Sequence, residues 1–241
     1  MKTTLITGVS RGLGAEIAEQ VINKNDAFVI GISRTFSDEV KCLAEKYPDN
    51  FMHIAFDLSD YENLKNIYWN TLKKIGQIES VIHNAAYAYD DLVSNANIQT
   101  LEYMYKVNVL SPIILTKYSI RDMLLNNIKG SIVFVTSISA HKGFKGLSMY
   151  ASTKGALEAF SKNVAKEWGA KGIRSNCVCP GFMETEMSSN ISSEMKMKIF
   201  NRTSLKKATD IKSVASSVAF LTSDESNSIT GQTIIVDCGT I

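Results

Sequence analysis

The sequence predicts an α/β fold in which one doubly wound sheet of about seven parallel strands carries helices on both faces. Strand-like and helix-like stretches alternate along the whole chain of 241 residues. The strand-like stretches are almost continuously apolar, which is typical of strands that are buried on both faces. The helix-like stretches between them have the length of a crossover between parallel strands.

The expected strands are short apolar runs that end at glycine or at polar residues. The first run, KTTLIT, leads directly into a glycine turn. We therefore interpret the N-terminal residues as a strand and not as a signal peptide. The expected strands are Lys2–Thr7, Ala27–Ser33, Phe51–Phe56, Ser80–His83, Ser131–Thr136, Arg174–Val178 and Gln232–Val236.

Helices are expected where apolar residues recur three and four positions apart. Ser59 or Asp60 can cap the helix that follows the third strand. Pro112 predicts a bend or a break within the fourth helix, because proline interrupts helical hydrogen bonding. The expected helices are Leu13–Asn23, Asp38–Tyr47, the stretch that ends at Ile75, Leu101–Asn126, Met149–Gly169 and Asp210–Leu221.

The composition indicates a single domain over residues 1–241 and argues against several kinds of partner. The chain is 45% hydrophobic and 21% charged, with only three prolines and no Pro/Gly-rich linker. Its net charge of +2 is too small to indicate nucleic acid or an anionic membrane. No apolar run reaches the ~18 residues of a membrane span. We expect a cytoplasmic protein with reduced cysteines, and no metal site because the three histidines lack ligand spacing.

A phosphate-binding turn is expected directly after the first strand. Thr7–Gly14 has the sequence TGVSRGLG, with the spacing G-x-x-x-G-x-G. Glycines let the backbone approach a pyrophosphate, and the N-terminus of the next helix offers N–H groups and a partial positive charge. A tight turn without a ligand is the alternative. The position between a first strand and a first helix favours a Rossmann-type dinucleotide site.

The end of the second strand indicates which dinucleotide binds. An NAD site has an acidic residue about 20 positions beyond the glycines, where it contacts the ribose 2′-hydroxyl. Here Ser33 and Arg34 occupy that place. A guanidinium suits a 2′-phosphate, and Arg11 in the turn adds a second positive charge. We therefore expect NADP(H), the alternative being that Arg34 is a solvated loop residue.

A tyrosine and a lysine stand four residues apart in the stretch MYASTKGA. On a helix this spacing places Tyr150 and Lys154 on one face. A neighbouring ammonium favours the phenolate and is expected to lower the pKa of the phenol from its usual value near 10. Proton transfer at neutral pH benefits from such a change. Taken alone, the pair is better explained by a half-buried tyrosine and a surface lysine.

With these motifs in order, the chain resembles the short-chain dehydrogenase/reductase family over nearly its whole length. The T-G-x-x-x-G-x-G turn is Thr7–Gly14, and the family's P-G-x-x-x-T segment is Pro180–Thr185. The family aspartate that holds the adenine is Asp57. The N-N-A-G segment corresponds to His83–Ala86, with histidine in place of the first asparagine and alanine in place of the glycine. We expect these two departures to tune cofactor binding without abolishing it.

The resemblance implies carbonyl reduction by hydride transfer, with a catalytic set of four residues. Tyr150 would be the general acid, Lys154 would also bind the nicotinamide ribose, and Ser137 would hold the substrate oxygen. Asn108 would position a water that connects Lys154 to solvent. The implied cofactor contacts are Gly8, Ser10, Arg11, Gly12, Leu13, Gly14, Ser33, Arg34, Asp57, Leu58, Asn84, Ala85, Ala86, Tyr150, Lys154, Pro180, Gly181, Met183 and Thr185.

Substrate contacts are expected from loops at the carboxyl ends of the strands, where such sheets bind ligands. The candidate loops are Tyr87–Val93, Ser139–Met149 and Phe182–Ser204. Ser139 is the alternative to Ser137, and His141 is expected to be a loop residue. Residues 182–204 contain Met183, Met187, Met195 and Met197, which favours a substrate lid with an apolar lining. An ordinary surface helix is the alternative.

Within the family, the second half of the chain is most similar to the 3-oxoacyl-acyl carrier protein reductases. The similar segments are YASTKGALEAFSKNVAKEW, GIRSNCVCPGFMETEM and FLTSDESNSITGQTIIVDCG. This implies an acyl-thioester substrate and an acidic acyl carrier protein that would meet Lys129 and Lys171. A reductase of a small ketone, diketone, sugar or polyol, and a non-catalytic cofactor-binding sensor, are the alternatives. The resemblance also implies a homotetramer or a homodimer.

Overall fold

Seven parallel strands form one sheet in the computed structural model, which describes residues 1–185 and 192–241. The strand order is β3-β2-β1-β4-β5-β6-β7, and it reverses direction between β1 and β4, so the sheet is doubly wound. The predicted fold class is confirmed, although β4 and β6 each extend two residues beyond their predicted bounds. The strands are β1 (Lys2–Thr7), β2 (Ala27–Ser33), β3 (Phe51–Ala55), β4 (Ile78–His83), β5 (Ser131–Val135), β6 (Arg174–Pro180) and β7 (Thr233–Val236).

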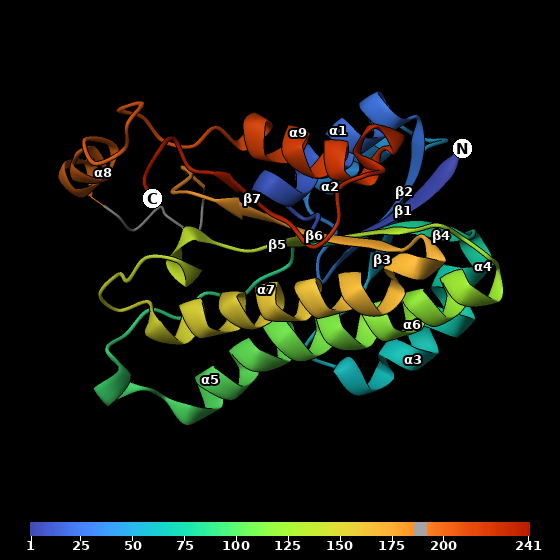
Figure 1. Cartoon of the computed structure of the whole chain (residues 1–241), viewed down its shortest axis with the longest axis horizontal. Helices are drawn as coiled ribbons and strands as arrows, with labels where there is room; N and C mark the ends of the chain where they lie inside the picture. The colour runs from blue at the N-terminus through green and yellow to red at the C-terminus, as the bar shows by residue number, and fades with distance from the viewer. Residues whose placement is uncertain (186–191) are drawn as a thin grey trace.

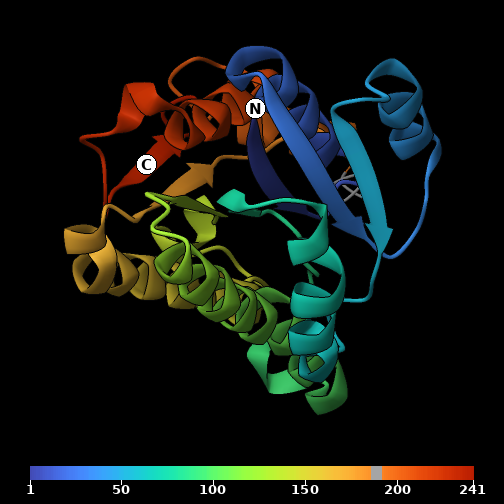
Figure 2. The same cartoon turned by 90° about the vertical axis from the view of Figure 1, so that its right-hand side faces the viewer.

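Helices cover both faces of the sheet, as Figures 1 and 2 show. Two apolar cores result, because adjacent strand residues point to opposite faces. In β2, for example, Val29 belongs to one core and Ile30 to the other, and both are fully buried. This explains the continuously apolar strands. One face carries α1 (Gly12–Asn25), α2 (Asp38–Lys46) and α9 (Ile211–Thr222), and the other carries α3 (Leu64–Ile67), α6 (Ser111–Leu125) and α7 (Ser148–Trp168).

Local capping residues explain where two of these helices begin. Ser37 precedes α2, and its hydroxyl accepts a hydrogen bond from the Val40 N–H at 3.3 Å. Asp210 precedes α9 and accepts from the Ser213 N–H at 3.2 Å. Each side chain satisfies a backbone donor of the first turn that has no partner within the helix.

The stretch from Tyr61 to Ile75 is helical, as predicted, but it is divided into short segments. A 3₁₀ turn over Tyr61–Asn63 precedes α3, and a π turn over Tyr68–Leu72 precedes α4 (Lys73–Ile75). The predicted side-chain cap at Ser59 or Asp60 is wrong. The Asp60 carboxylate accepts instead from the Asn63 side chain at 2.7 Å, which leaves no cap bond to the backbone.

The predicted interruption of the long helix at Pro112 is confirmed. α5 (Ile98–Tyr105) and α6 flank a π turn over Lys106–Leu110, and Pro112 stands in the first turn of α6. A proline is tolerated there because the first N–H groups of a helix need no acceptor within it. The π turn contains Asn108, and such wide turns are frequent at functional sites.

The carboxyl ends of the parallel strands share one edge of the sheet. The loops after β4, β5 and β6, together with α8 (Ser193–Phe200), gather at the left of Figure 1. Lys129 and Lys171 precede β5 and β6 and therefore lie at the opposite edge. The prediction that they meet a carrier protein beside the site is wrong for this reason. None of the helices in the described part of the chain is both long and apolar enough to cross a membrane.

Leu5 lies in the middle of β1 and is fully buried, so truncating it should leave a cavity in the core. Leu5→Ala is expected to lower the free energy of unfolding by about 2–5 kcal/mol. Leu125→Ala is the matched control, because Leu125 is 71% exposed and should change stability by less than about 0.5 kcal/mol. Denaturant titration of both variants checks this, and equal effects would contradict the described core.

Candidate active site

The glycine turn joins β1 to α1 and is anchored to the end of β4. The Thr7 hydroxyl accepts hydrogen bonds from the backbone N–H groups of Asn84 at 3.1 Å and Ala85 at 3.2 Å. The Asn84 side chain donates to the Gly8 carbonyl at 3.1 Å. Asn84 and Ala85, two of the predicted cofactor contacts, therefore also hold the turn in place. Ala86, a third, is half-buried in the loop that follows β4.

The turn has the features that a pyrophosphate requires. Gly8 and Gly12 adopt left-handed backbone conformations, with φ of 78° and 56°. A Cβ added to Gly14 would lie 1.9 Å from the Gly8 carbonyl oxygen, so only glycine fits where α1 starts. The N-cap residue Arg11 makes no side-chain cap bond to α1. The first N–H groups of the helix thus have no side-chain cap, and they suit an anionic ligand. Leu13 is 8% exposed and packs into the core.

Ser33 and Arg34 lie at the carboxyl end of β2, next to this turn. The Arg34 guanidinium donates to the Tyr103 hydroxyl of α5 at 3.0 Å. The Ser33 hydroxyl donates to the Thr35 carbonyl at 3.0 Å and lies 2.8 Å from His53 Nε2. The carbonyl of Ser10 accepts from Ser37, which joins the glycine turn to the start of α2. The predicted binding residues of β1 and β2 thus share one edge.

The remaining predicted cofactor residues follow β3 and β6 at the same edge. Asp57 accepts from the Ser59 N–H at 2.8 Å, and the buried Leu58 accepts from Ser111 through its carbonyl. Pro180 ends β6, and the Gly181 N–H donates to the Val236 carbonyl at 2.9 Å. Met183 packs beside the core, and Thr185 is described too, whereas Met187 lies outside the described residues. Whether these residues bind a cofactor stays a prediction.

Tyr150 and Lys154 lie one turn apart on α7, with the ammonium 5.6 Å from the centre of the tyrosine ring. Lys154 is only 2% exposed, and its Nζ donates to the Val135 carbonyl at 2.9 Å. Val135 ends β5, two residues before Ser137. The structure therefore brings Tyr150, Lys154 and Ser137 together at the carboxyl end of β5, as the sequence predicts.

Burial sets the pKa values of this pair. It lowers the pKa of Lys154 to about 8, because a buried ammonium loses its hydration. Burial raises the pKa of the Tyr150 phenol, and the negative charge of Asp90 raises it further. The prediction that Lys154 lowers the pKa of this phenol is wrong. The ammonium is directed at the Val135 carbonyl, and the cost of burying a phenolate dominates. The phenol is consequently protonated at neutral pH.

Ser137 follows β5 at the start of a 3₁₀ turn over Ile138–Ala140. Its hydroxyl oxygen accepts from the Ser139 N–H at 3.2 Å and from the Ser139 hydroxyl at 3.1 Å. A serine hydroxyl has two acceptor positions and one donor, so this geometry directs the Ser137 proton toward another acceptor. Ser139 consequently orients the Ser137 hydroxyl, and which of the two serines would hold a substrate stays a prediction.

Asn108 connects the loop after β4 to α7 from within the π turn. It is fully buried, accepts from the Tyr87 N–H at 2.7 Å and donates to the Tyr87 carbonyl at 2.9 Å. Its amide also donates to the Thr153 hydroxyl at 3.1 Å, and Thr153 donates to the Tyr150 carbonyl at 2.7 Å. Asn108 is thus linked through Thr153 to the backbone of Tyr150. Its role in positioning a water stays a prediction.

The sequence offered weak signals for three residues that the structure adds to the site. Asp90 was part of a candidate substrate loop, and its charge acts on Tyr150. Thr153 lies inside the Y-x-x-x-K motif but has no role in that pattern. Glu158 follows Lys154 by one helical turn and is buried at 6% exposure. A lone carboxylate on the apolar face of a predicted helix was the only clue to its importance.

His83, one of the two departures from the family pattern, has a structural role. It is 3% exposed, stacks on Phe134 with 4.7 Å between ring centroids, and lies 2.8 Å from the Thr116 hydroxyl of α6. Burial lowers the pKa of this imidazole to about 3, so it is neutral. His83 therefore packs against Phe134 of β5 and Thr116 of α6, on the side of the sheet away from α1.

The lowered pKa of Lys154 makes a prediction for stability. Between about pH 8 and pH 10 the folded protein binds fewer protons at this residue than the unfolded chain does, so its contribution to stability rises with pH. Relative to Lys154→Met, the cofactor-free wild type should gain about 2–3 kcal/mol between about pH 7 and pH 10. Denaturant titrations at several pH values measure this difference. The cysteines titrate in the same range, but they do so in both proteins and cancel in the comparison. If the stability difference between wild type and Lys154→Met does not change with pH, the ammonium is not buried as described.

Comparisons with known proteins show which proteins this chain is similar to. A family model described as "Enoyl-(Acyl carrier protein) reductase" matches residues 8–240. The 3-oxoacyl-[acyl-carrier-protein] reductase FabG of Buchnera aphidicola subsp. Baizongia pistaciae is 33% identical over 243 residues, covering 99% of this chain and 98% of that protein. Carbonyl reductase [NADPH] 2 of Sus scrofa is 30% identical over 237 residues, covering 98% of this chain and 94% of that protein.

Solved structures have the same fold. The structure titled "ElxO with NADP Bound" superimposes with a TM-score of 0.90 at 30% identity, and the match covers 99% of this chain and 98% of that one. The family model, the full-length relatives and the order of the motifs all support one assignment. The chain therefore belongs to the short-chain dehydrogenase/reductase family of oxidoreductases.

Proposed function

We propose that this protein reduces the keto group of a 3-oxoacyl thioester to a hydroxyl, using NADPH. One observation carries the proposal above the others. A protonated, half-buried Tyr150 lies one helical turn from a buried Lys154, and the lysine is bonded to the strand end that leads to Ser137. A proton donor, a cation and a hydroxyl therefore converge at the ligand-binding edge of the sheet.

Tyr150 supplies the proton in this proposal. When bound, NADPH provides the hydride that the carbonyl carbon accepts. The negative charge that develops on the substrate oxygen is then neutralised by the phenol. Burial keeps the pKa of Tyr150 above its usual value, so the acid is in its protonated form at neutral pH. An alkoxide is a stronger base than a phenolate, and proton transfer from the tyrosine remains favourable.

Ser137, Lys154 and Asn108 orient the reacting groups. Ser137 accepts two hydrogen bonds from Ser139, which leaves its own hydroxyl proton for the substrate oxygen. Lys154 returns a proton to the tyrosine after each turnover, because its pKa of about 8 lies below that of the phenol. Asn108 keeps α7 and the loop after β4 in register through Tyr87 and Thr153. We propose that it also positions the water that connects the lysine to solvent.

NADP(H) fits the groups at the glycine turn and at the end of β2. The start of α1 carries no side-chain cap, and the missing Cβ of Gly14 lets the helix start pack closely against the Gly8 carbonyl. Arg34 presents a guanidinium where the ribose 2′-phosphate would lie. The similarity to a structure with NADP bound supports the same choice. Ser33, Asp57, Asn84 and Thr185 are proposed as further contacts of the cofactor.

The acyl-thioester substrate is proposed from the relatives named as 3-oxoacyl-[acyl-carrier-protein] reductases. An acidic carrier protein would need basic residues at the carboxyl edge of the sheet. Lys142 and Lys145 are exposed in the loop between β5 and α7, and so occupy that edge. A small-ketone reductase is the second candidate, favoured by the similarity to a carbonyl reductase.

Residues 182–204 are proposed as the lid of the substrate site. The described part contains α8, on which Met195 and Met197 are 51% and 55% exposed. Exposed methionines on a short helix suit an adaptable apolar contact with an acyl chain. We further propose a cytoplasmic homotetramer or homodimer in which α6 and α7 pair with their copies. Light scattering of the purified protein measures this state.

A panel of carbonyl compounds tests the reaction and the role of Tyr150. Wild-type protein should oxidise NADPH with a 3-oxoacyl thioester faster than with small free ketones, sugars or diketones. Tyr150→Phe should lower kcat by about 10²–10⁴-fold, because the proton donor is lost. Tyr105→Phe is the control and should retain turnover. Tyr105 ends α5, and its hydroxyl lies 2.8 Å from the Ser152 hydroxyl of α7, but it is not one of the four proposed catalytic residues. If cofactor binds but no carbonyl is reduced, the protein is a sensor and the proposal is wrong.

Arg34→Asp tests the choice of cofactor. Removing the guanidinium and adding a negative charge should weaken NADPH binding by about 10- to 100-fold and leave NADH binding unchanged or improved. Quenching of intrinsic fluorescence by each cofactor measures the two affinities. Arg121→Asp, on the exposed surface of α6, makes the same change in charge away from the turn. An unchanged preference in Arg34→Asp would remove the assigned role.

A further inference from the structure

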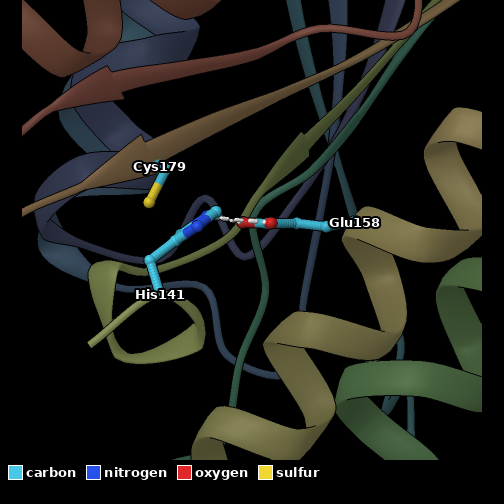
Figure 3. A group of neighbouring side chains, drawn as sticks. All are labelled: His141, Glu158 and Cys179. Carbon is cyan, nitrogen blue, oxygen red and sulfur yellow. Dashed lines mark hydrogen bonds and ion pairs between the residues drawn. The ribbon is translucent and has the colours of Figure 1, made fainter. Parts of the chain in front are cut away.

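A buried carboxylate on α7 contacts the segment that carries Ser137. Glu158 is 6% exposed, and its Oε1 accepts from the Thr136 hydroxyl at 2.8 Å. The His141 Nε2–H donates to the same carboxylate, with distances of 3.0 and 2.9 Å to the two oxygens. Figure 3 shows His141 and Glu158 pointing toward one another from the loop after β5 and from α7.

These two partners lie on either side of the proposed substrate-binding serine. Thr136 directly precedes Ser137, and His141 directly follows the 3₁₀ turn over Ile138–Ala140. The Thr136 N–H is held by the Val178 carbonyl of β6 at 2.8 Å, so its end of the segment is already fixed to the sheet. The bond from His141 to Glu158 fixes the other end. One carboxylate thus holds both ends of the turn that presents Ser137.

The same helix face holds the sheet at two adjacent positions. Lys154 bonds the Val135 carbonyl, and Glu158, one turn later, bonds Thr136, the next residue of the strand end. Residues four apart on a helix share a face. Two bonds to consecutive residues fix how far α7 can slide along β5. Tyr150 belongs to this helix, so its distance from Ser137 depends on both bonds.

Burying a carboxylate in this position has no evident purpose in folding. An isolated buried charge is costly, and apolar residues of similar volume often replace buried ionic groups with no loss of stability. Here each oxygen of the carboxylate has a hydrogen-bond partner, and the partners are the residues that flank Ser137. The geometry therefore suits orientation of a reacting group better than stabilisation of the core.

We propose that Glu158 is a positioning residue, which holds Ser137 in the correct place relative to Tyr150 and Lys154. The inference rests on the catalytic roles proposed above for those residues. His141 and Thr136 transmit the effect, because each makes its side-chain bond to this carboxylate. A misplacement of about 1 Å in an active site can lower turnover by 10²-fold, so the loss of both bonds should be measurable.

Cys179 adjoins this pair, and the ligand atoms of His141, Glu158 and Cys179 all lie within 4.8 Å of one another. Such a set of residue types can hold zinc. In this structure, however, the carboxylate already accepts hydrogen bonds from Thr136 and His141. Burial also raises the pKa of the Cys179 thiol to about 12, so the thiol is protonated. Measurement of the metal content distinguishes the two roles.

A double-mutant cycle tests the inference. Glu158→Leu keeps the volume but removes both bonds, and it should lower kcat by about 10- to 100-fold. In the Ser137→Ala background the same change should cost less than about twofold, since Glu158 acts through Ser137. Glu158→Gln should recover most of the activity, because an amide oxygen still accepts from Thr136. Affinity for NADPH should be unchanged in all of these variants.

Glu167→Leu is the matched control, because Glu167 is exposed on the same helix and should keep full turnover. If Glu158→Leu does not fold, Thr136→Val removes one of the two bonds and should show a smaller loss with the same dependence on Ser137. Equal losses with and without the Ser137 hydroxyl would overturn the inference. So would one zinc per chain that disappears in Cys179→Ser.

Failure of the proposed function gives a different pattern from failure of this inference. If the single variant Ser137→Ala keeps full turnover, the assigned role of Ser137 is wrong and the inference fails with it. If Ser137→Ala is slow and the cycle is additive, the proposed reaction stands and only the positioning role of Glu158 is overturned.

Discussion

The candidate site depends on one buried hydrogen bond, from the Lys154 ammonium to the Val135 carbonyl. Lys154 is 2% exposed and loses most of its hydration. This loss lowers the pKa of its ammonium to about 8. The carbonyl at the end of β5 compensates for part of this cost, and it is available because the strand ends there. The bond fixes α7 against the carboxyl edge of the sheet. Tyr150 on the helix and Ser137 after the strand are both placed by it.

The other elements of the site support this contact from two directions. The π turn that precedes Pro112 brings Asn108 inward, where it ties Thr153 of α7 to the loop after β4. That loop also anchors the glycine turn, through Asn84 and the carbonyl of Gly8. The loop after β4 therefore joins two regions at one edge of the sheet. Asn84 bonds the region expected to bind the cofactor, and Tyr87 bonds Asn108, which leads to the region expected to transfer the proton.

The sequence was sufficient to predict the sheet and to single out the main candidate residues, whose roles stay predictions. Strands such as Lys2–Thr7 were found because burial on both faces makes them continuously apolar. Tyr150 and Lys154 were found because their spacing and their neighbours along the chain are distinctive. The spacing could not show where the ammonium points, and the direction of the pKa of Tyr150 was therefore predicted wrongly. Partners far apart in the chain, such as Glu158 and Thr136, leave no periodic signal. Lys129 was assigned to the site wrongly for another reason. It precedes β5 and therefore lies at the amino end of that strand, whereas the site lies at the carboxyl end.

The charge states at the candidate site suit the acid step of the proposed reduction. A phenol whose pKa is raised by burial holds its proton at neutral pH, as an acid must before it can protonate an alkoxide. Dehydrogenation would require the same group to start as a phenolate, in buried surroundings where the charge of Asp90 also opposes a second negative charge. Lys154 can offset this only through its own positive charge, and burial already disfavours that charge. In the proposed reduction, a protonated phenol beside a buried ammonium therefore holds the proton that the substrate oxygen needs.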